Sequence, residues 1–83
     1  MKKSFGLPEH RQFLDLLLES RQNAGLTQQQ LAKKIDETQS FVSKIERGEI
    51  RMDLVQLNTY CQAMGTTLSK FVREFEARVA AEG

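Results

Sequence analysis

Five polar side chains between residues 28 and 44 offer the clearest chemistry in this chain. They carry amide, hydroxyl and ammonium groups, which donate and accept hydrogen bonds and so suit the base edges and phosphates of a DNA major groove. Apolar residues at helical spacing alternate with them, so the polar set is expected on the outer face of two short helices. The set is Gln28, Gln39, Ser40, Ser43 and Lys44.

The two helices can be located from their caps. Thr27, followed three residues later by Gln30, predicts a capping box and a first helix ending near residue 34. Thr38 predicts the start of the second helix, over 38–47, and Gly48 its end. The two inner faces are predicted to be Leu31, Ala32 and Ile35, and Phe41, Val42 and Ile45.

The rest of the chain predicts three further helices and no strand. One runs from Pro8 to about residue 24, where Gly25 ends it. Another begins after Asp53 and is expected to bury Leu54, Leu57, Cys61 and Met64. The last covers 68–82. We therefore expect an all-α fold of five helices in one domain, 1–83, with its core over about 8–75.

Composition excludes several classes of protein. The single Cys61 cannot form an internal disulfide, and with only His10 beside it no zinc site is expected. Neither a nucleophile–base pair nor a phosphate loop is present in the sequence, so we expect no enzyme, no metal and no cofactor. The longest apolar cluster, 16–18, is far too short to span a bilayer, and residues 1–12 do not form a signal peptide. A cytoplasmic protein without a membrane partner is the expectation.

Charge is concentrated in the middle of the chain. The net charge is only +1, but residues 21–51 carry six basic and four acidic side chains. The two short helices lie within this positively charged middle part of the chain. Because the excess is small, binding to phosphate must depend on local geometry more than on a long-range field.

The chain resembles the lambda-repressor-like helix-turn-helix family of phage repressors, Cro proteins and Xre-type regulators over residues 17 to 72. The resemblance rests on Arg21, Gly25 to Gln28, Leu31-Ala32, Val42-Ser43, Glu46-Arg47-Gly48 and Leu57. It implies that the helix-turn-helix unit is formed by the second and third helices. Arg21 and Glu46 recur together in this family as a structural ion pair.

Two positions in the turn between these helices depart from the family. Asp36 stands where the family usually has glycine, and Glu37 where it usually has an apolar residue. Aspartate tolerates the left-handed conformation at a cost of about 1 kcal/mol, so the turn should keep its shape. Glu37 predicts looser apolar packing beneath the turn.

The resemblance also implies contacts with double-stranded DNA. Base contacts are expected from Gln39, Ser40 and Lys44, with Ser43 at the edge of the site. A solvated polar face, and for Thr38 a role as a helix cap alone, are the alternatives. Phosphate contacts are expected from Thr27, Gln28, Thr38, Arg47 and Arg51.

The last helix carries a longer apolar stripe than a small domain needs for its own core. We expect this extension, 68–82, to contribute to a homodimer; the alternative is that its end packs back on the same domain. The function expected is a repressor that binds a short pseudo-palindromic operator as a homodimer. An antitoxin that binds a toxin protein is the alternative, and RNA polymerase is a further protein partner considered. The stripe is Leu68, Phe71, Val72, Phe75 and Val79.

Overall fold

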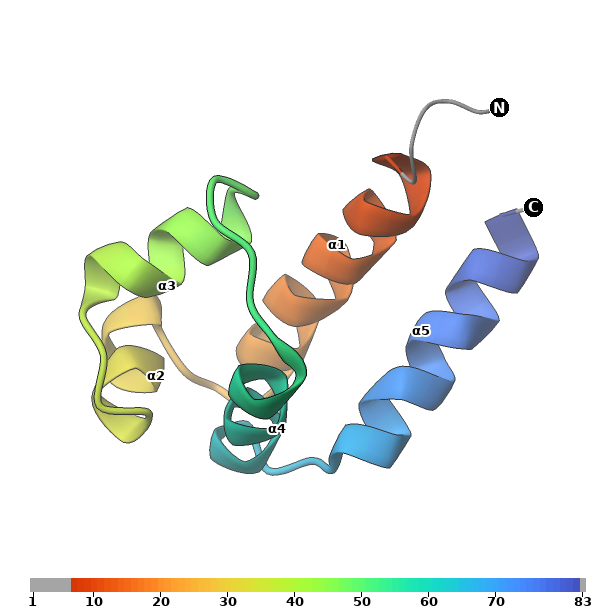
Figure 1. Ribbon diagram of the computed structural model, residues 1–83. Coiled ribbons are helices and arrows are strands. Elements are labelled where there is room, and N and C mark those ends of the chain that lie inside the picture. The colour runs from red at the N-terminus through yellow and green to blue at the C-terminus, as the bar shows by residue number, and fades with distance from the viewer. Residues whose placement is uncertain (1–6, 83) are drawn as a thin grey trace.

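The computed structural model describes residues 7–82, which fold into five helices (Figure 1). Helices α1 and α5 lie side by side on one side of the molecule, α2 and α3 form the other side, and α4 lies between them. Within the described range every regular element is a helix, so the predicted all-α fold is confirmed. The helices are α1 Leu7–Asn23, α2 Gln28–Lys34, α3 Gln39–Glu46, α4 Leu54–Ala63 and α5 Leu68–Glu82.

Side-chain caps fix the starts of the three central helices. The Thr27 hydroxyl accepts the backbone N–H of Gln30, and the Gln30 amide oxygen accepts the N–H of Thr27, at 3.0 and 2.9 Å. Thr38 caps α3 by accepting the N–H of Phe41. Asp53 caps α4 as expected. Gln56 completes a second capping box there, which was not predicted from the sequence. Each such cap contributes on the order of 1 kcal/mol.

The turn between α2 and α3 keeps its shape despite the missing glycine. Asp36 has φ 60°, the one positive value among the non-glycine residues described. Left-handed aspartate was the prediction, and it is confirmed. The next residue, Glu37, donates its backbone N–H to the carbonyl of Ala32 at 2.8 Å, while its side chain is exposed. The acidic side chain therefore adds no apolar packing beneath the turn.

The core lies where α1, α4 and α5 meet the inner faces of α2 and α3. Ala32 is buried in the closely packed α2–α3 pair, as its small size predicts. The predicted buried stripe of α4 needs one correction: Leu54 is 64% exposed, and Tyr60, which was not predicted, is 2% exposed. Leu54 is the first residue of α4, so it projects past the edge of the core. The fully buried side chains include Leu17, Leu31, Val42, Ile45 and Cys61.

Helix α5 packs on α1 through aromatic rings and ion pairs. The Phe13 ring contacts Phe71 and Phe75 edge to face, with centroid distances of 5.9 and 6.3 Å. Arg78 bridges the two helices by pairing with Glu19 at 2.6 Å and with Glu74 at 3.0 Å. Much of the predicted dimer stripe is therefore used within one chain.

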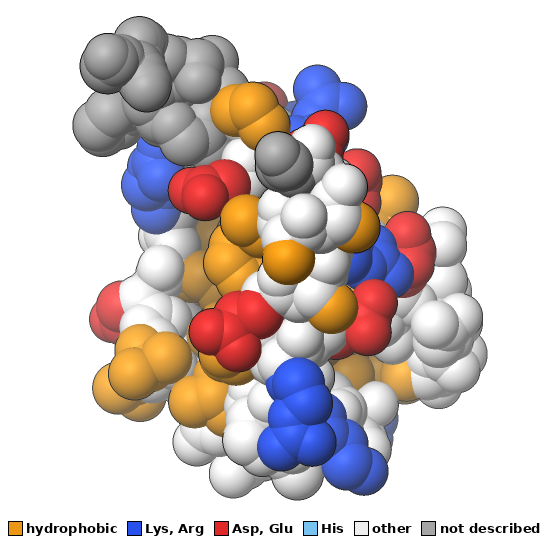
Figure 2. Space-filling view, turned by 90° about the vertical axis from the view of Figure 1, so that its right-hand side faces the viewer, with side chains coloured by type: hydrophobic (Ala, Val, Ile, Leu, Met, Phe, Trp, Pro, Cys, Tyr) orange, Lys and Arg blue, Asp and Glu red, His pale blue; other side chains and the backbone are white. Residues whose placement is uncertain are grey.

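This packing corrects one part of the predicted dimer surface. Phe71 is only 4% exposed, because Phe13 covers it, so it cannot present its ring to a partner. Of the remaining four residues, Val72 is 36% exposed, and Leu68, Phe75 and Val79 are partly buried. The α5 side of the molecule accordingly shows small hydrophobic patches separated by charged side chains, not one continuous area (Figure 2).

Candidate nucleic-acid interface

The outer face of α3 presents four polar side chains to solvent. Their positions, at i, i+1, i+4 and i+5, place them on one side of the helix. On the opposite side Val42 and Ile45 are buried, with exposures of 0% and 1%. The inner face is thus anchored in the core while the outer face can approach a ligand. Gln39, Ser40 and Lys44 are exposed, and Ser43 is partly buried.

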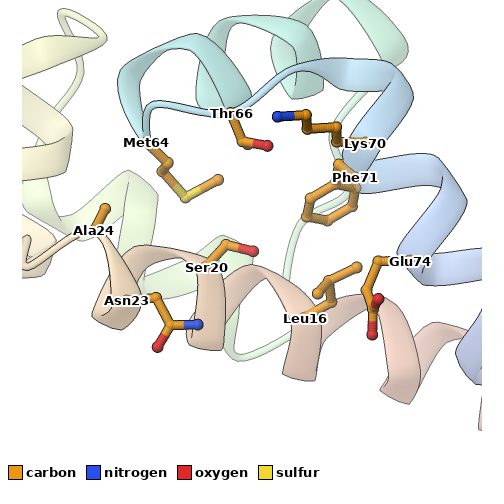
Figure 3. Close-up of a pocket in the computed structure, with 9 residues that line it drawn as sticks. All are labelled: Leu16, Ser20, Asn23, Ala24, Met64, Thr66, Lys70, Phe71 and Glu74. Atoms are coloured by element: carbon orange, nitrogen blue, oxygen red, sulfur yellow. The ribbon is translucent and has the colours of Figure 1, made fainter.

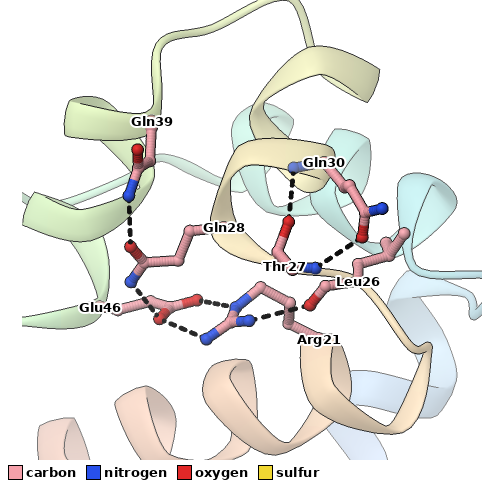
Figure 4. A network of polar contacts seen from close by, with 7 residues as sticks. All are labelled: Arg21, Leu26, Thr27, Gln28, Gln30, Gln39 and Glu46. Carbon is pink, nitrogen blue, oxygen red and sulfur yellow. Dashed lines mark hydrogen bonds and ion pairs between the residues drawn. The ribbon is translucent and has the colours of Figure 1, made fainter.

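An ion pair fixes the end of α3 to α1. Arg21 donates to the two carboxylate oxygens of Glu46 at 2.7 and 3.1 Å, and to the carbonyl of Leu26 at 2.9 Å (Figure 4). Both side chains are nearly enclosed, with exposures of 11% and 7%. Such bidentate geometry holds a guanidinium and a carboxylate in one orientation. The ion pair therefore fixes the orientation of α3, and of its exposed outer face, at the C-terminal end of the helix.

The same carboxylate extends the network to the exposed face. Gln28 donates its amide N–H to Glu46 at 3.0 Å, and Gln39 donates to the amide oxygen of Gln28 over a longer distance of 3.4 Å (Figure 4). Gln28 is partly buried, so the expectation that it points freely outward is wrong. Its side chain instead links the Arg21–Glu46 ion pair to Gln39 on the exposed face of α3. No local sequence pattern joins residues 28, 39 and 46, although the family resemblance places all three in the same unit.

This network determines which way the two amides face. A carboxylate only accepts hydrogen bonds, so the Gln28 nitrogen must face Glu46 and its oxygen must face Gln39. Gln39 then turns its own nitrogen toward Gln28. One N–H and the carbonyl oxygen of Gln39 remain available, which is the donor and acceptor pair that adenine N7 and N6 require.

Two threonines flank the polar face. Thr27 and Thr38 accept backbone N–H groups as caps, so their hydroxyl hydrogens stay available for donation. Both residues are exposed. Donors at helix starts are suited to phosphate oxygens.

Charged residues continue the surface past the end of α3. Arg47 donates to Glu49 at 2.7 Å and also to the hydroxyl of Ser43. The hydrogen bond and charge of Glu49 raise the pKa of Arg47, and Arg47 in turn lowers the pKa of Glu49.

Arg51 is exposed in the loop that follows α3. The pKa of His10 on α1 is lowered, first by the burial of the imidazole and second by the positive charge of Arg51. Gly48, at the start of this loop, lies directly against Leu14 and His10 of α1, a proximity that the sequence does not indicate.

A helical pair with an anchored inner face and a hydrogen-bonding outer face defines a helix-turn-helix protein. Residues 17–71 match the model of the helix-turn-helix family. The chain is also similar to the solved structure of an XRE-family like protein from Pseudomonas syringae pv. tomato str. DC3000, with 37% sequence identity and a TM-score of 0.84 over 90% of this chain and 92% of that one. The chain belongs to the XRE-type helix-turn-helix family, a family of DNA-binding regulators and not of enzymes.

Two further solved structures share the fold. Both are of the clp gene regulator ClgR from Corynebacterium glutamicum, at 22% and 21% identity with TM-scores of 0.77 and 0.74. They cover 89% and 84% of this chain and 79% and 91% of theirs. Among curated proteins none matches the chain. Across residues 7–82, none of the helices combines the length and the apolar character needed to cross a membrane.

Proposed function

We propose that this DNA-binding transcriptional regulator is a repressor that acts in the cytoplasm and binds a short pseudo-palindromic operator as a homodimer. The recognition segment is 38–47, which enters the major groove. One observation carries the proposal: the outer face of α3 is polar and open, while its inner face is held by the core and by the Arg21–Glu46 ion pair. A helix held in this way can present side chains to base edges at a defined angle.

Different contacts would read the sequence and position the protein. Gln39 would bind adenine through its free N–H and carbonyl, and Lys44 would donate to guanine O6 or N7. Ser40 and Ser43 have hydroxyls that suit either kind of base. Gln28 uses one amide hydrogen on Glu46 and keeps the second for a phosphate. The remaining phosphate contacts are Thr27, Thr38, Arg47 and Arg51.

A two-fold operator requires a second copy of the chain. Centre-to-centre spacing of half-sites in such complexes is about 34 Å, one turn of DNA. We propose that the exposed part of the α5 stripe, chiefly Val72 with Leu68 and Val79 beside it, contributes to the contact between the two chains. Because Phe71 and Phe75 pack within the chain, the apolar area left is small. The dimer is therefore expected to form more readily on DNA than in solution.

Selection of binding sites from random duplex DNA, followed by measurement of stoichiometry on the winning site, tests this proposal. An enriched inverted repeat that holds two chains is expected, and Gln39→Ala should lose the preference at one base pair of each half-site. Gln62→Ala, an exposed glutamine on α4, is the matched control and should select the same repeat. No enrichment at moderate salt would contradict the proposal and would favour a protein partner such as a toxin.

A further inference from the structure

The guanidinium of Arg47 is held by two neighbours. Arg47 is the first residue after α3, and its Nε donates to the carboxylate of Glu49 at 2.7 Å. One of its terminal nitrogens donates to the hydroxyl of Ser43, which lies one helical turn earlier. The Arg47 side chain therefore runs back along α3 instead of extending past the end of the helix.

Glu49 is the acidic partner of this guanidinium. Across residues 7–82 no other carboxylate forms an ion pair with Arg47, and the nearby Glu46 is already paired with Arg21. The hydrogen bond from Arg47, followed by the charges of Arg47 and Lys44, lowers the pKa of Glu49, so the carboxylate is ionised at neutral pH. Glu49 thus lies within electrostatic range of two cations that are proposed to contact DNA.

The ion pair is open to exchange with a phosphate. The side chains of Arg47 and Glu49 are 55% and 50% exposed. A carboxylate and a phosphate offer the same kind of charged oxygen acceptor to a guanidinium. A DNA phosphate that reaches this end of α3 must therefore replace Glu49, because the guanidinium is already paired.

We propose that Glu49 limits the affinity of this protein for DNA by competing with a backbone phosphate for Arg47. The inference rests on the proposed role of Arg47 as a phosphate contact. Arg47 must leave Glu49 to bind the phosphate, so the attraction that it gains is offset by the one that it loses. Because a phosphate carries no sequence information, Glu49 lowers the affinity for all DNA sequences alike.

The test is the affinity of the full chain for a random-sequence duplex, measured by fluorescence anisotropy between about 50 and 200 mM salt. Glu49→Gln keeps the size of the side chain and removes its charge. It should bind about threefold to fivefold more tightly, the value of one exposed ion pair. The slope of log affinity against log salt should become steeper by about one, because one more phosphate is neutralised without a compensating loss.

A second substitution separates competition for Arg47 from a general loss of negative charge. In the parent chain Arg47→Gln should weaken binding less than about twofold, because Glu49 offsets the phosphate contact. In the Glu49→Gln background the same substitution should remove the whole gain and restore the salt slope of the parent. Simple repulsion between Glu49 and DNA would give the same gain with or without Arg47, so the double-mutant cycle distinguishes the two.

Matched controls lie away from α3, at the rim of a hollow between α1 and the start of α5 (Figure 3). Glu74 is 53% exposed and also pairs with an arginine, Arg78, at 3.0 Å. Glu74→Gln therefore repeats both the change in charge and the loss of an exposed ion pair, and should leave affinity and salt slope near those of the parent. Lys70 is exposed, and Lys70→Gln in the Glu49→Gln background should leave the gain in place.

Three results would overturn this role of Glu49. The first is an affinity of Glu49→Gln no higher than that of Glu74→Gln. The second is a gain that persists in the Arg47→Gln background, and the third is an unchanged salt slope, since no further phosphate is then neutralised. A random-sequence duplex needs no operator, so a site selection without an enriched repeat would contradict the proposed function and leave these affinities measurable.

Discussion

Removal of the Glu46 carboxylate is the most informative single perturbation of this molecule. Glu46→Ala deletes the acceptor for two hydrogen bonds from Arg21 and for one from Gln28. The Arg21 side chain is only 11% exposed, so its charge would be left largely enclosed with one remaining bond, to the carbonyl of Leu26. Loss of one partner of a buried pair leaves an uncompensated charge, which is costly.

The expected loss is about 3–5 kcal/mol in the free energy of unfolding. A chain of 83 residues has a total stability of roughly 4–12 kcal/mol, so the variant should be marginally folded at 25 °C. Replacement of both partners, as Arg21→Met with Glu46→Leu, should recover most of the loss, because no charge then remains unpaired. The free energy of unfolding is therefore expected to depend less on the attraction between Arg21 and Glu46 than on neither charge being left buried without its partner.

Urea unfolding followed by circular dichroism measures the effect. Glu49→Ala is the matched control: it removes the partner of Arg47, but both of those side chains are at least half exposed, at 55% and 50%. A screened pair of that kind is expected to change stability by less than about 1 kcal/mol. If Glu46→Ala also costs less than about 1 kcal/mol, the buried network does not anchor α3, and the reasoning is refuted.

Three further predictions follow from the same structure. Lys44→Ala should change base preference in a site selection, whereas Arg51→Ala should weaken binding to all sequences and reduce the salt slope by about one; equal effects on every sequence would remove this division of labour. Tyr60→Phe should leave the urea midpoint unchanged or raised, because the hydroxyl has no partner, and a clear decrease would reveal a bond that the structure lacks. Burial and the charge of Arg51 lower the pKa of His10 below its usual 6.5, so its contribution to stability is full above pH 6.5 and is lost as the pH falls through the lowered value. His10→Gln should flatten that part of the pH dependence of urea unfolding, and an unchanged profile would contradict it.

Local signals predicted most of the fold. Thr27, Thr38 and Asp53 were identified as caps from residue type and spacing, and the structure shows each accepting the expected backbone N–H. Asp36 was expected to be left-handed, and its φ of 60° confirms this. These features depend on a few neighbouring residues, which is why the sequence alone reveals them.

Features that depend on packing were harder to predict. Leu54 and Tyr60 both fit an apolar face of α4, and only the position of the core edge decides that the tyrosine is buried and the leucine exposed. The spacing of Phe71 on α5 agrees with a dimer stripe, but in the structure α5 packs on α1 and Phe13 covers the Phe71 ring. Helix periodicity gives a face, but it does not say which element covers that face.

The candidate site shows the same division. The exposed outer face of α3 follows from its periodicity, and it was predicted. The role of Gln28 between Glu46 and Gln39 was not, because it depends on the angle at which α2 crosses α3. Stability and the proposed DNA recognition therefore share one residue. Glu46 anchors α3 through Arg21, and through Gln28 it also orients the Gln39 amide that is proposed to contact a base.

The central claim, that Gln39 reads adenine, can be tested most directly by one affinity measurement. In the selected operator, the adenine whose preference is lost in Gln39→Ala is replaced by 7-deazaadenine, which lacks the N7 acceptor. The parent chain should lose affinity about fivefold or more, whereas Gln39→Ala should bind both DNAs equally. Equal binding of the two DNAs by the parent chain would contradict base reading by this amide.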